Sequence, residues 1–338
     1  MGIVLTGIGK TLPKFEVANS ILETMVDTDN EWIVSRTGIE SRHIATDESG
    51  VDLACSASRG AMGWTEEGWC PQKVTPDSID LVIVATITPD ALVPSMAALI
   101  KKELGLENAV AFDINAACTG FIYGLLVAQS VIHTSIDLPQ NNRMRRALVI
   151  GVERMSRITD WTDRGTCILF GDGAGAAIIE HNPDSAGILG IYVKNYDDNK
   201  EVLSCGMSFD AIPFADDSAA APQHILMQGQ QVFKFAANAV ADSLTQVLEQ
   251  TGIVLDDIKR IVPHQANERI IKYAAQKLGL PMDRFQISMH DTGNVSAASI
   301  PMALCDQFLE GDLEPGDKIA LVGFGGGLTA GAAIIEIS

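Results

Sequence analysis

The sequence predicts an α/β fold made of two similar halves, and two observations lead to this prediction. The first is a set of short segments that are apolar throughout, as expected of strands covered by helices on both faces of a sheet. Helical periodicity lies between them, most clearly over residues 119–133 and 231–250. Strands that alternate with helices are the pattern of α/β proteins. The six predicted strands are residues 81–85, 109–112, 147–150, 175–179, 260–262 and 318–322.

The second observation is that the order of these signals recurs about half a chain length later. The apolar strand at 147–150 has its counterpart at 319–322, and each is followed by a glycine. Sequence identity between the two series is slight, so only the pattern repeats. We therefore predict two α/β halves, residues 1–182 and 183–338, related by a pseudo-twofold axis. Each half then contributes an equivalent strand–helix corner to one shared site.

Composition and charge exclude several classes of function. The chain has 338 residues and a formal net charge of −19, which argues against nucleic acid and anionic membranes as partners. No uninterrupted apolar run approaches the ~20 residues that cross a bilayer. The chain's start lacks the positive charge of a secretory signal, so we expect a buried first strand at residues 3–8 and a cytoplasmic protein. Its six cysteines lack metal-site spacing, so we expect reduced thiols and no metal.

One segment departs from this acidic character. From Lys259 to Arg284 there are six basic residues and two acidic ones. Two interpretations stay open: an ordinary solvated surface, or a docking surface for an acidic partner.

The chemistry is predicted to centre on Cys118. A strand ends in small residues, the cysteine follows, and an amphipathic helix begins at once. Small neighbours let a substrate approach, and a helix N-terminus supplies positive potential and free N–H donors. Such a position can lower the pKa of a thiol by one to several units. We therefore predict that Cys118 is the acyl-accepting nucleophile, and that most of the other cysteines are small core residues.

The second half offers groups that complement this thiol. His264 follows a predicted strand, and Asn294 lies at the corner that mirrors the Cys118 corner. The glycine-rich run 323–327 presents backbone N–H groups without side chains in the way, which suits an oxyanion hole. We find no carboxylate partner for the imidazole, so His264 and Asn294 are predicted to act as neutral donors to one oxygen. That arrangement suits an enolate formed when a carboxylate is lost as carbon dioxide.

These residues resemble the 3-oxoacyl-[acyl-carrier-protein] synthase III family, thiolase-fold condensing enzymes that initiate bacterial type II fatty acid synthesis. The resemblance runs from end to end and implies an acyltransferase that is a homodimer with a five-layered αβαβα architecture. It implies no cofactor, because acyl-CoA is a substrate. The motifs that carry it are Asp27–Ile39, Ala116–Phe121, Asp163–Thr166, Phe170–Gly175, Val262–Asn267, Gly293–Pro301 and Phe324–Gly327.

The resemblance also implies a role for each matching residue. Acyl-CoA acylates Cys118 while the backbone N–H groups of Cys118 and Gly326 hold the oxyanion. His264 and Asn294 then stabilise the enolate that forms as malonyl-acyl-carrier protein loses carbon dioxide. Further residues have binding roles: Thr28, Trp32, Arg36, Arg157 and Asn267 for CoA, Val93 and Phe324 for the acyl pocket, and Lys234, Arg269 and Lys277 for the carrier protein.

Several features depart from the family pattern or leave alternatives open. Val93 stands where a phenylalanine often narrows the acyl pocket, so the size of the primer stays open. A longer loop over residues 134–146 has no assigned role. The alternatives are a secondary-metabolite synthase or acyltransferase of the same family, and a non-catalytic binding protein. A degradative thiolase would need a second cysteine in the run 324–327, which has none. A hydroxymethylglutaryl-CoA synthase would need a catalytic glutamate, for which we find no convincing candidate.

Overall fold

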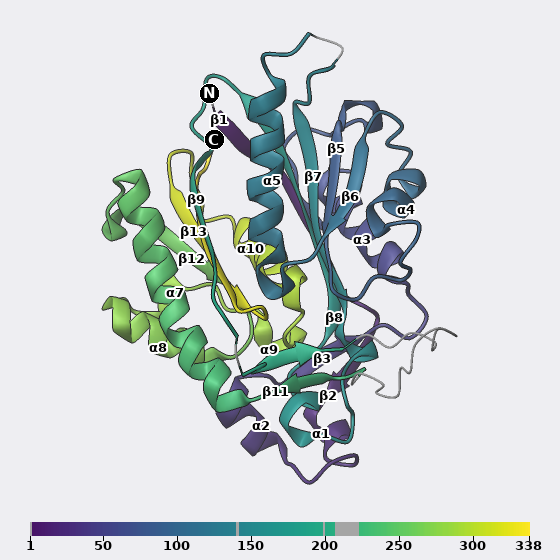
Figure 1. Cartoon of the computed structure of the whole chain (residues 1–338), viewed down its shortest axis with the longest axis vertical. Coiled ribbons are helices and arrows are strands. Elements are labelled where there is room, and N and C mark those ends of the chain that lie inside the picture. The colour runs from purple at the N-terminus through teal and green to yellow at the C-terminus, as the bar shows by residue number, and fades with distance from the viewer. Residues whose placement is uncertain (1, 140–141, 199, 207–222) are drawn as a thin grey trace, which may run out of the picture.

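The computed structural model describes residues 2–139, 142–198, 200–206 and 223–338. Two sheets dominate it, with helices between them and on both outer faces (Figure 1). The first sheet has the strand order β4-β1-β8-β7-β5-β6 and the second has the order β12-β13-β14-β9. The longer loop expected over 134–146 falls partly outside the described residues, at positions 140 and 141.

The strands of each sheet come from one part of the chain. The first sheet comprises β1 (Gly2–Thr11), β4 (Gly68–Trp69), β5 (Leu81–Ala85), β6 (Val110–Ile114), β7 (Arg146–Arg154) and β8 (Asp172–Asn182). The second comprises β9 (Ile188–Asn195), β12 (Ile258–Pro263), β13 (Lys318–Gly325) and β14 (Thr329–Glu336). Two small hairpins pair β2 (Phe15–Ala18) with β3 (Ser41–Ile44), and β10 (Leu203–Cys205) with β11 (Ile225–Met227). The six predicted strands and the predicted first strand are confirmed, while the boundary at 182/183 stays a prediction.

The helices fall into three layers and several connecting turns. The α-helices are α1 (Asn19–Leu22), α2 (Asn30–Thr37), α3 (Gly50–Ala61), α4 (Met96–Glu103), α5 (Gly120–Ser135), α6 (Arg164–Cys167), α7 (Gly229–Thr251), α8 (Glu268–Leu278), α9 (Met289–Thr292) and α10 (Ser299–Glu310). Short 3₁₀ turns are η1 (Pro76–Ser78), η2 (Ala117–Thr119), η4 (Met155–Arg157), η5 (Leu255–Asp257), η6 (Met282–Arg284) and η7 (Ser296–Ala298). The predicted helices over 119–133 and 231–250 are confirmed as α5 and α7.

The apolar residues sort these elements into five layers. The central layer is α5 and α10, where Phe121 and Leu304 pack together with Val149 of the first sheet and Leu321 of the second. Helices α3 and α4 cover the outer face of the first sheet. Helices α7 and α8 cover the outer face of the second sheet (Figure 1). The αβαβα architecture implied by the family resemblance is therefore confirmed.

The central position of α5 explains its unusual composition. Residues 117–135 are apolar and long enough to cross a membrane, yet half of that stretch is buried inside the protein. A helix enclosed by sheets on both sides is expected to be apolar nearly all round. This stretch is therefore a core helix of the five-layered fold.

Local signals set the ends of the helices that surround the site. Helix α8 begins after Asn267, whose side-chain oxygen accepts a hydrogen bond of 2.9 Å from the Arg269 N–H. It ends at Gly279, which adopts a left-handed conformation with φ of 69°. An asparagine cap and a terminal left-handed glycine are common at helix ends. The buried face of α8 between these ends, which includes Ile270 and Ala274, packs against the second sheet.

The two halves meet at matching corners. Turn η2 leads into α5 in the first half, and turn η7 leads into α10 in the second. Ala117 and Ser296 open these turns with positive φ angles of 46° and 44°. At each corner an asparagine side chain two residues earlier accepts from the backbone N–H, at 3.2 Å for Asn115 and 2.9 Å for Asn294. The pseudo-twofold relation therefore extends to the backbone of the corners.

Glycines allow each corner to touch a strand of the other half. A Cβ atom on Gly325 of β13 would lie 2.8 Å from the Cys118 nitrogen. A Cβ atom on Gly151 of β7 would lie 2.2 Å from the Ala297 carbonyl oxygen. Because real Cβ atoms do not approach backbone this closely, larger residues would push the corners apart. These two contacts fix the corners where the sheets face each other.

Candidate active site

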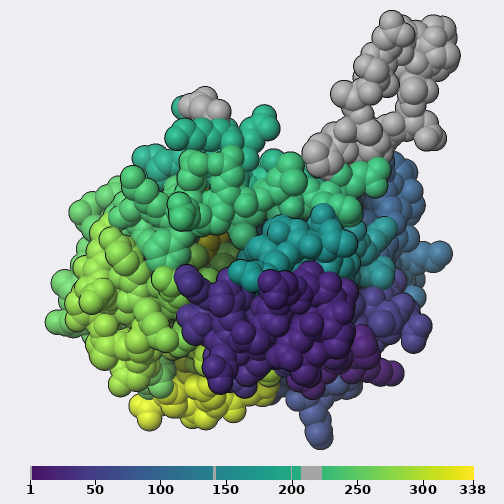
Figure 2. Space-filling view, turned by 90° about the horizontal axis from the view of Figure 1, so that it is seen from below, coloured from purple at the N-terminus to yellow at the C-terminus, as the bar shows by residue number. Residues whose placement is uncertain are grey.

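A cavity of about 1090 Å³ lies between the two corners. Its lining includes Cys118 from the first half and His264, Asn294, Phe324 and Gly326 from the second. Figure 2 shows the molecule hollowed where the purple N-terminal segment, the teal segment and the green segment meet. The residues predicted for chemistry therefore line one space, although they are separated widely in the sequence.

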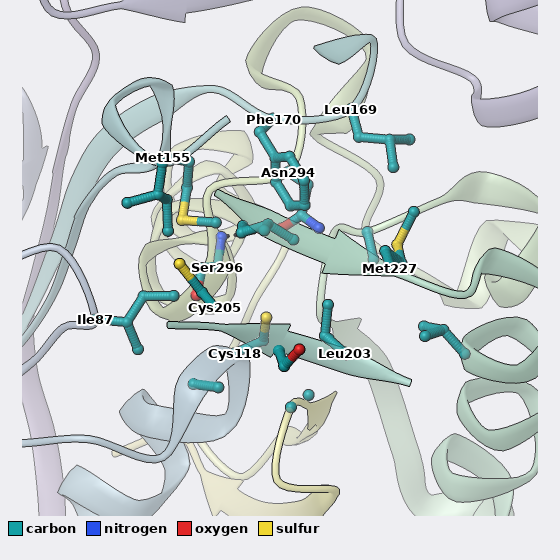
Figure 3. A pocket seen from close by; sticks show the side chains of 18 of the residues that line it. Ile87, Cys118, Met155, Leu169, Phe170, Leu203, Cys205, Met227, Asn294 and Ser296 are labelled. Carbon is teal, nitrogen blue, oxygen red and sulfur yellow. Dashed lines mark hydrogen bonds between the residues drawn. The ribbon is translucent and has the colours of Figure 1, made fainter. Parts of the chain in front are cut away.

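Cys118 lies at the bottom of this cavity, in turn η2 just before α5 (Figure 3). Burial raises the pKa of its thiol to about 12, whereas the sequence position alone led us to expect a lowered pKa. The reason is that the enclosed site removes the water that would solvate a thiolate. The first turn of α5 opposes this effect through its positive end. The resting residue is therefore a thiol and not a thiolate.

His264 follows β12 and is enclosed on all sides. Its Nδ1 atom lies 2.6 Å from the Ser299 hydroxyl oxygen, and its ring meets the edge of Phe324 at 5.1 Å between centroids. Burial lowers the pKa of the imidazole to about 3. The imidazole is therefore neutral at physiological pH, as the sequence predicted for a hydrogen-bonding group rather than a charged one.

Asn294 is held so that its amide group can donate into the cavity. Its side-chain oxygen accepts from the Ser296 N–H, which leaves the NH₂ group free to serve the cavity. Its backbone N–H donates to the Leu169 carbonyl oxygen at 2.8 Å, and its carbonyl oxygen accepts from Gly171 at 3.1 Å. The segment just before β8 of the first half therefore fixes the asparagine of the second.

The predicted oxyanion donors also lie at the cavity wall. Cys118 and Gly326 both line it, and a Cβ atom on Gly326 would come 3.7 Å from the Cβ atom of Ala117, the residue before Cys118. Within the described residues, neither the Cys118 N–H nor the Gly326 N–H donates to a side chain. Two backbone donors on adjoining loops, with no side chain between them, suit an oxyanion that forms at a thioester carbonyl.

The walls above the thiol are apolar, and one predicted wall residue is misplaced. Phe324 lines the cavity, as predicted. Val93 does not: its side chain is 86% exposed, and its neighbour Leu92 lines the cavity instead. A residue in the loop after β5 can take either orientation, and spacing in the sequence does not decide between them. Figure 3 shows the other apolar walls, namely Ile87, Met155, Leu169, Phe170, Leu203 and Met227.

The predicted CoA residues gather at the mouth, although not all of them reach the cavity. Arg36, Arg157 and Asn267 line it, whereas Thr28 and Trp32 lie outside its lining. Trp32 lies beside a cavity-lining residue, since the guanidinium of Arg36 is 5.9 Å from the centre of the indole ring.

Arg164 is an addition that we did not predict. Its guanidinium stands 4.2 Å from the Trp32 ring, closer than that of Arg36. A cation against an indole face is a favourable stacking arrangement. Arg164 belongs to the motif Asp163–Thr166, which was identified in the sequence. Its contact with Trp32 was not predictable from the sequence, because it depends on α6 lying beside α2 in the fold.

The basic stretch from Lys259 to Arg284 is largely neutralised by its surroundings. Lys277 pairs with Asp242 at 3.0 Å, and Lys272 pairs with Glu268 at 2.9 Å. Lys259 and Arg260 likewise pair with carboxylates, of Asp317 and Asp312 respectively. Within the described residues, Arg269 makes no ion pair, and its guanidinium lies 5.9 Å from the Phe233 ring. The positive surface is therefore smaller than the sequence indicated.

The low pKa of His264 predicts a loss of stability in acid. The unfolded imidazole takes up a proton below its ordinary value of 6.5, but the folded one does so only near 3. The unfolded state thus binds more protons in this range, and the free energy of unfolding falls as pH falls from 6.5. By pH 5 this should cost about 2 kcal/mol. Urea unfolding at pH 8 and pH 5 measures this change in the free energy of unfolding. The change should be smaller for His264→Gln than for the wild type, and an equal change in both would contradict the buried neutral state of His264.

Comparisons with known proteins agree with this geometry. Residues 112–196 match the family model of 3-oxoacyl-[acyl-carrier-protein (ACP)] synthase III, and residues 248–337 match the model of its C-terminal part. The beta-ketoacyl-[acyl-carrier-protein] synthase III of Clostridium perfringens is 43% identical over 98% of both chains.

Solved structures agree as well. The 3-oxoacyl-[acyl-carrier-protein] synthase III of Aquifex aeolicus has a TM-score of 0.87 at 37% identity, covering 99% of this chain and 100% of its own. The priming beta-ketosynthase of the R1128 polyketide pathway has a TM-score of 0.87 at 34% identity, covering 100% of this chain and 97% of its own. The chain belongs to the 3-oxoacyl-[acyl-carrier-protein] synthase III family of condensing acyltransferases.

Proposed function

We propose that this enzyme condenses an acyl-CoA primer with malonyl-acyl-carrier protein and so initiates type II fatty acid synthesis. The products are 3-oxoacyl-carrier protein, CoA and carbon dioxide. The observation that carries the proposal is one cavity lined by a buried thiol from the first half and two neutral donors from the second. A nucleophile and separate enolate donors are what a decarboxylative condensation requires.

The first half-reaction forms an acyl-Cys118 thioester. The sulfur attacks the carbonyl carbon of acyl-CoA while the N–H groups of Cys118 and Gly326 stabilise the oxyanion. The carbon–sulfur bond to CoA then breaks and CoA leaves. Apolar walls above the thiol suit the acyl chain, and Phe324 lies among them.

The second half-reaction makes the carbon–carbon bond. Malonyl-carrier protein loses carbon dioxide, and the resulting enolate oxygen accepts hydrogen bonds from His264 and Asn294. A neutral imidazole and a neutral amide stabilise this oxygen by hydrogen bonds and do not form an ion pair with it. The enolate carbon attacks the acyl thioester, and the Cys118 sulfur is the leaving group.

Partners and location complete the proposal. The mouth residues Arg36, Arg157 and Asn267 would hold CoA, with Trp32 and Thr28 further out. The enzyme would act as a homodimer in the cytoplasm. In that homodimer, the partner subunit would cover the exposed apolar pair Leu92 and Val93, at 64% and 86% exposure.

A second candidate is a priming ketosynthase of secondary metabolism. The similarity to the R1128 priming enzyme favours it, since that protein is nearly as similar in structure and identity as the Aquifex one. Both candidates share the same chemistry and differ in the primer. A panel of straight, branched and aromatic acyl-CoAs, scored by the acyl mass on Cys118, distinguishes them.

The central test is acylation of Cys118. Cys118→Ser should lower the rate of covalent acylation by acyl-CoA at least about 10³-fold, because a hydroxyl lacks an accessible anion. Intact-protein mass spectrometry measures this directly. Cys205→Ser is the matched control, since Cys205 lines the same cavity and should be dispensable. Acylation that survives in Cys118→Ser would mean that another residue is the nucleophile.

The carrier-protein surface can be tested with two charge-reversal variants, one at Arg269, which makes no ion pair within the described residues, and one at Lys277, which does. Arg269→Glu should raise the KM for malonyl-carrier protein about tenfold at low salt, because it removes an unpaired cation from an acidic enzyme. Lys277→Glu should have a smaller effect, since Asp242 already neutralises Lys277. Acylation by acyl-CoA should persist in both variants. Equal effects of the two reversals, or loss of acylation in Arg269→Glu, would contradict this assignment.

A further inference from the structure

A buried carboxyl group stands beside the active site, and the mechanism so far gives it no role. Glu153 lies on β7 among apolar residues and is 0% exposed. Its oxygens accept hydrogen bonds from the Thr88 hydroxyl at 2.6 Å, the Thr86 hydroxyl at 3.2 Å and the backbone N–H groups of Ile87 and Thr88. A buried acid surrounded by donors is held in a fixed place and can exist as a carboxylate.

Ser296 lies between this carboxyl group and the nucleophile. Its side chain is 0% exposed, and its turn η7 packs against both η2, which carries Cys118, and β7, which carries Glu153. Burial raises the pKa of both Cys118 and Glu153, and the Ser296 side chain lowers both. Within the described residues, its hydroxyl makes no hydrogen bond of standard geometry. Figure 3 shows Ser296, Cys118 and Asn294 among the residues around the cavity. An unengaged, fully buried hydroxyl between a thiol and a carboxyl group is placed to pass a proton.

The other charged groups near Glu153 are engaged elsewhere. Arg154, the next residue on β7, faces Asp90 at 3.6 Å. Asp172 on the neighbouring strand β8 accepts from Ser156 and from the Ala45 N–H. Cys118 in turn η2 is the titratable group that interacts with Glu153: burial raises the pKa of the thiol most, and the Glu153 carboxylate raises it further. Glu153 and Cys118 are therefore an interacting pair.

His264 is a poorer acceptor for the thiol proton. Burial lowers the pKa of its imidazole to about 3, and its Nδ1 atom is engaged with Ser299. Burial raises the pKa of Glu153 to about 7, near the pH at which a cytoplasmic enzyme operates. A base works best when its pKa is near the operating pH.

We propose that Glu153, acting through the Ser296 hydroxyl, accepts the Cys118 proton during acylation and keeps it until the thiol is released. This inference rests on the proposed function, because it assumes that Cys118 takes the acyl group. In the first step the Cys118 S–H bond breaks, its proton moves to the Ser296 oxygen, and the proton of Ser296 moves to the Glu153 carboxylate. The sulfur bonds to the acyl carbon, and CoA leaves as a thiolate that takes a proton from solvent.

The second half-reaction returns the proton. The enolate carbon bonds to the acyl carbon, and the electron pair of the breaking carbon–sulfur bond goes to Cys118. The thiolate takes the proton of Ser296, and Glu153 reprotonates that hydroxyl and becomes a carboxylate again. One solvent proton is consumed in each full cycle, by the departing CoA.

The test is the pH profile of Cys118 acylation, followed by mass spectrometry from pH 5 to 9. In the wild type the rate should fall as pH drops through about 7, because a protonated Glu153 cannot accept a proton. Glu153→Gln should acylate about 10²-fold more slowly at pH 7.5 and should lose the inflection near pH 7. Ser296→Ala should show the same loss, and alanine fits the backbone there because Ala117 adopts a φ within 2° of that of Ser296 at the matching corner.

A matched control, and the direction in which the acylation rate changes in Glu153→Gln, distinguish a proton relay from a purely electrostatic role of Glu153. Asp172→Asn removes another fully buried carboxylate and should retain the inflection near pH 7. If Glu153 acted only as a charge, its removal would ease thiolate formation and acylation would become faster. A faster or unchanged Glu153→Gln, or an inflection that persists in Ser296→Ala, overturns the relay. A wild type that gains no acyl mass on Cys118 overturns the proposed function itself, and the relay with it.

Discussion

The site depends on the close backbone contact between the two corners at the pseudo-twofold axis. Gly325 of the second half lies against the nitrogen of Cys118, and Gly151 of the first half lies against the carbonyl of Ala297. Neither approach leaves room for a side chain. Because α5 and α10 start from these corners and fill the layer between the sheets, the same contacts set the positions of Cys118, Asn294 and the central core.

Enclosure of the corners determines the electrostatics of the site. Removal of water raises the pKa of Cys118, lowers that of His264 and raises that of Glu153. All three shifts favour the neutral form of each group. A neutral histidine suits donation to an enolate oxygen, while a neutral thiol needs a proton acceptor. The inferred relay through Ser296 supplies that acceptor from the first half, opposite the donors of the second.

The fold and the central residues could be predicted from the sequence because local signals carry them. Apolar runs identified the strands, and the small residues around Cys118 and the strand end before His264 identified the corners. The surface assignments depended on contacts that sequence order does not record. Val93 proved exposed because a loop can turn either way, and Lys277 proved paired because α7 brings Asp242 beside it. Glu153 interrupts an apolar strand, which was an available signal, but its link to Cys118 exists only in three dimensions.

The central claim is that the halves divide the chemistry: the first supplies the nucleophile, and the second supplies the donors for decarboxylation. Measuring both half-reactions in His264→Ala and Asn294→Ala tests it most directly. Acylation of Cys118, read by mass, should stay within about threefold of wild type, because backbone N–H groups hold that oxyanion. Carbon dioxide release from malonyl thioester should fall at least about 100-fold. Decarboxylation at the wild-type rate in either variant, or equal loss of both half-reactions, would contradict this division.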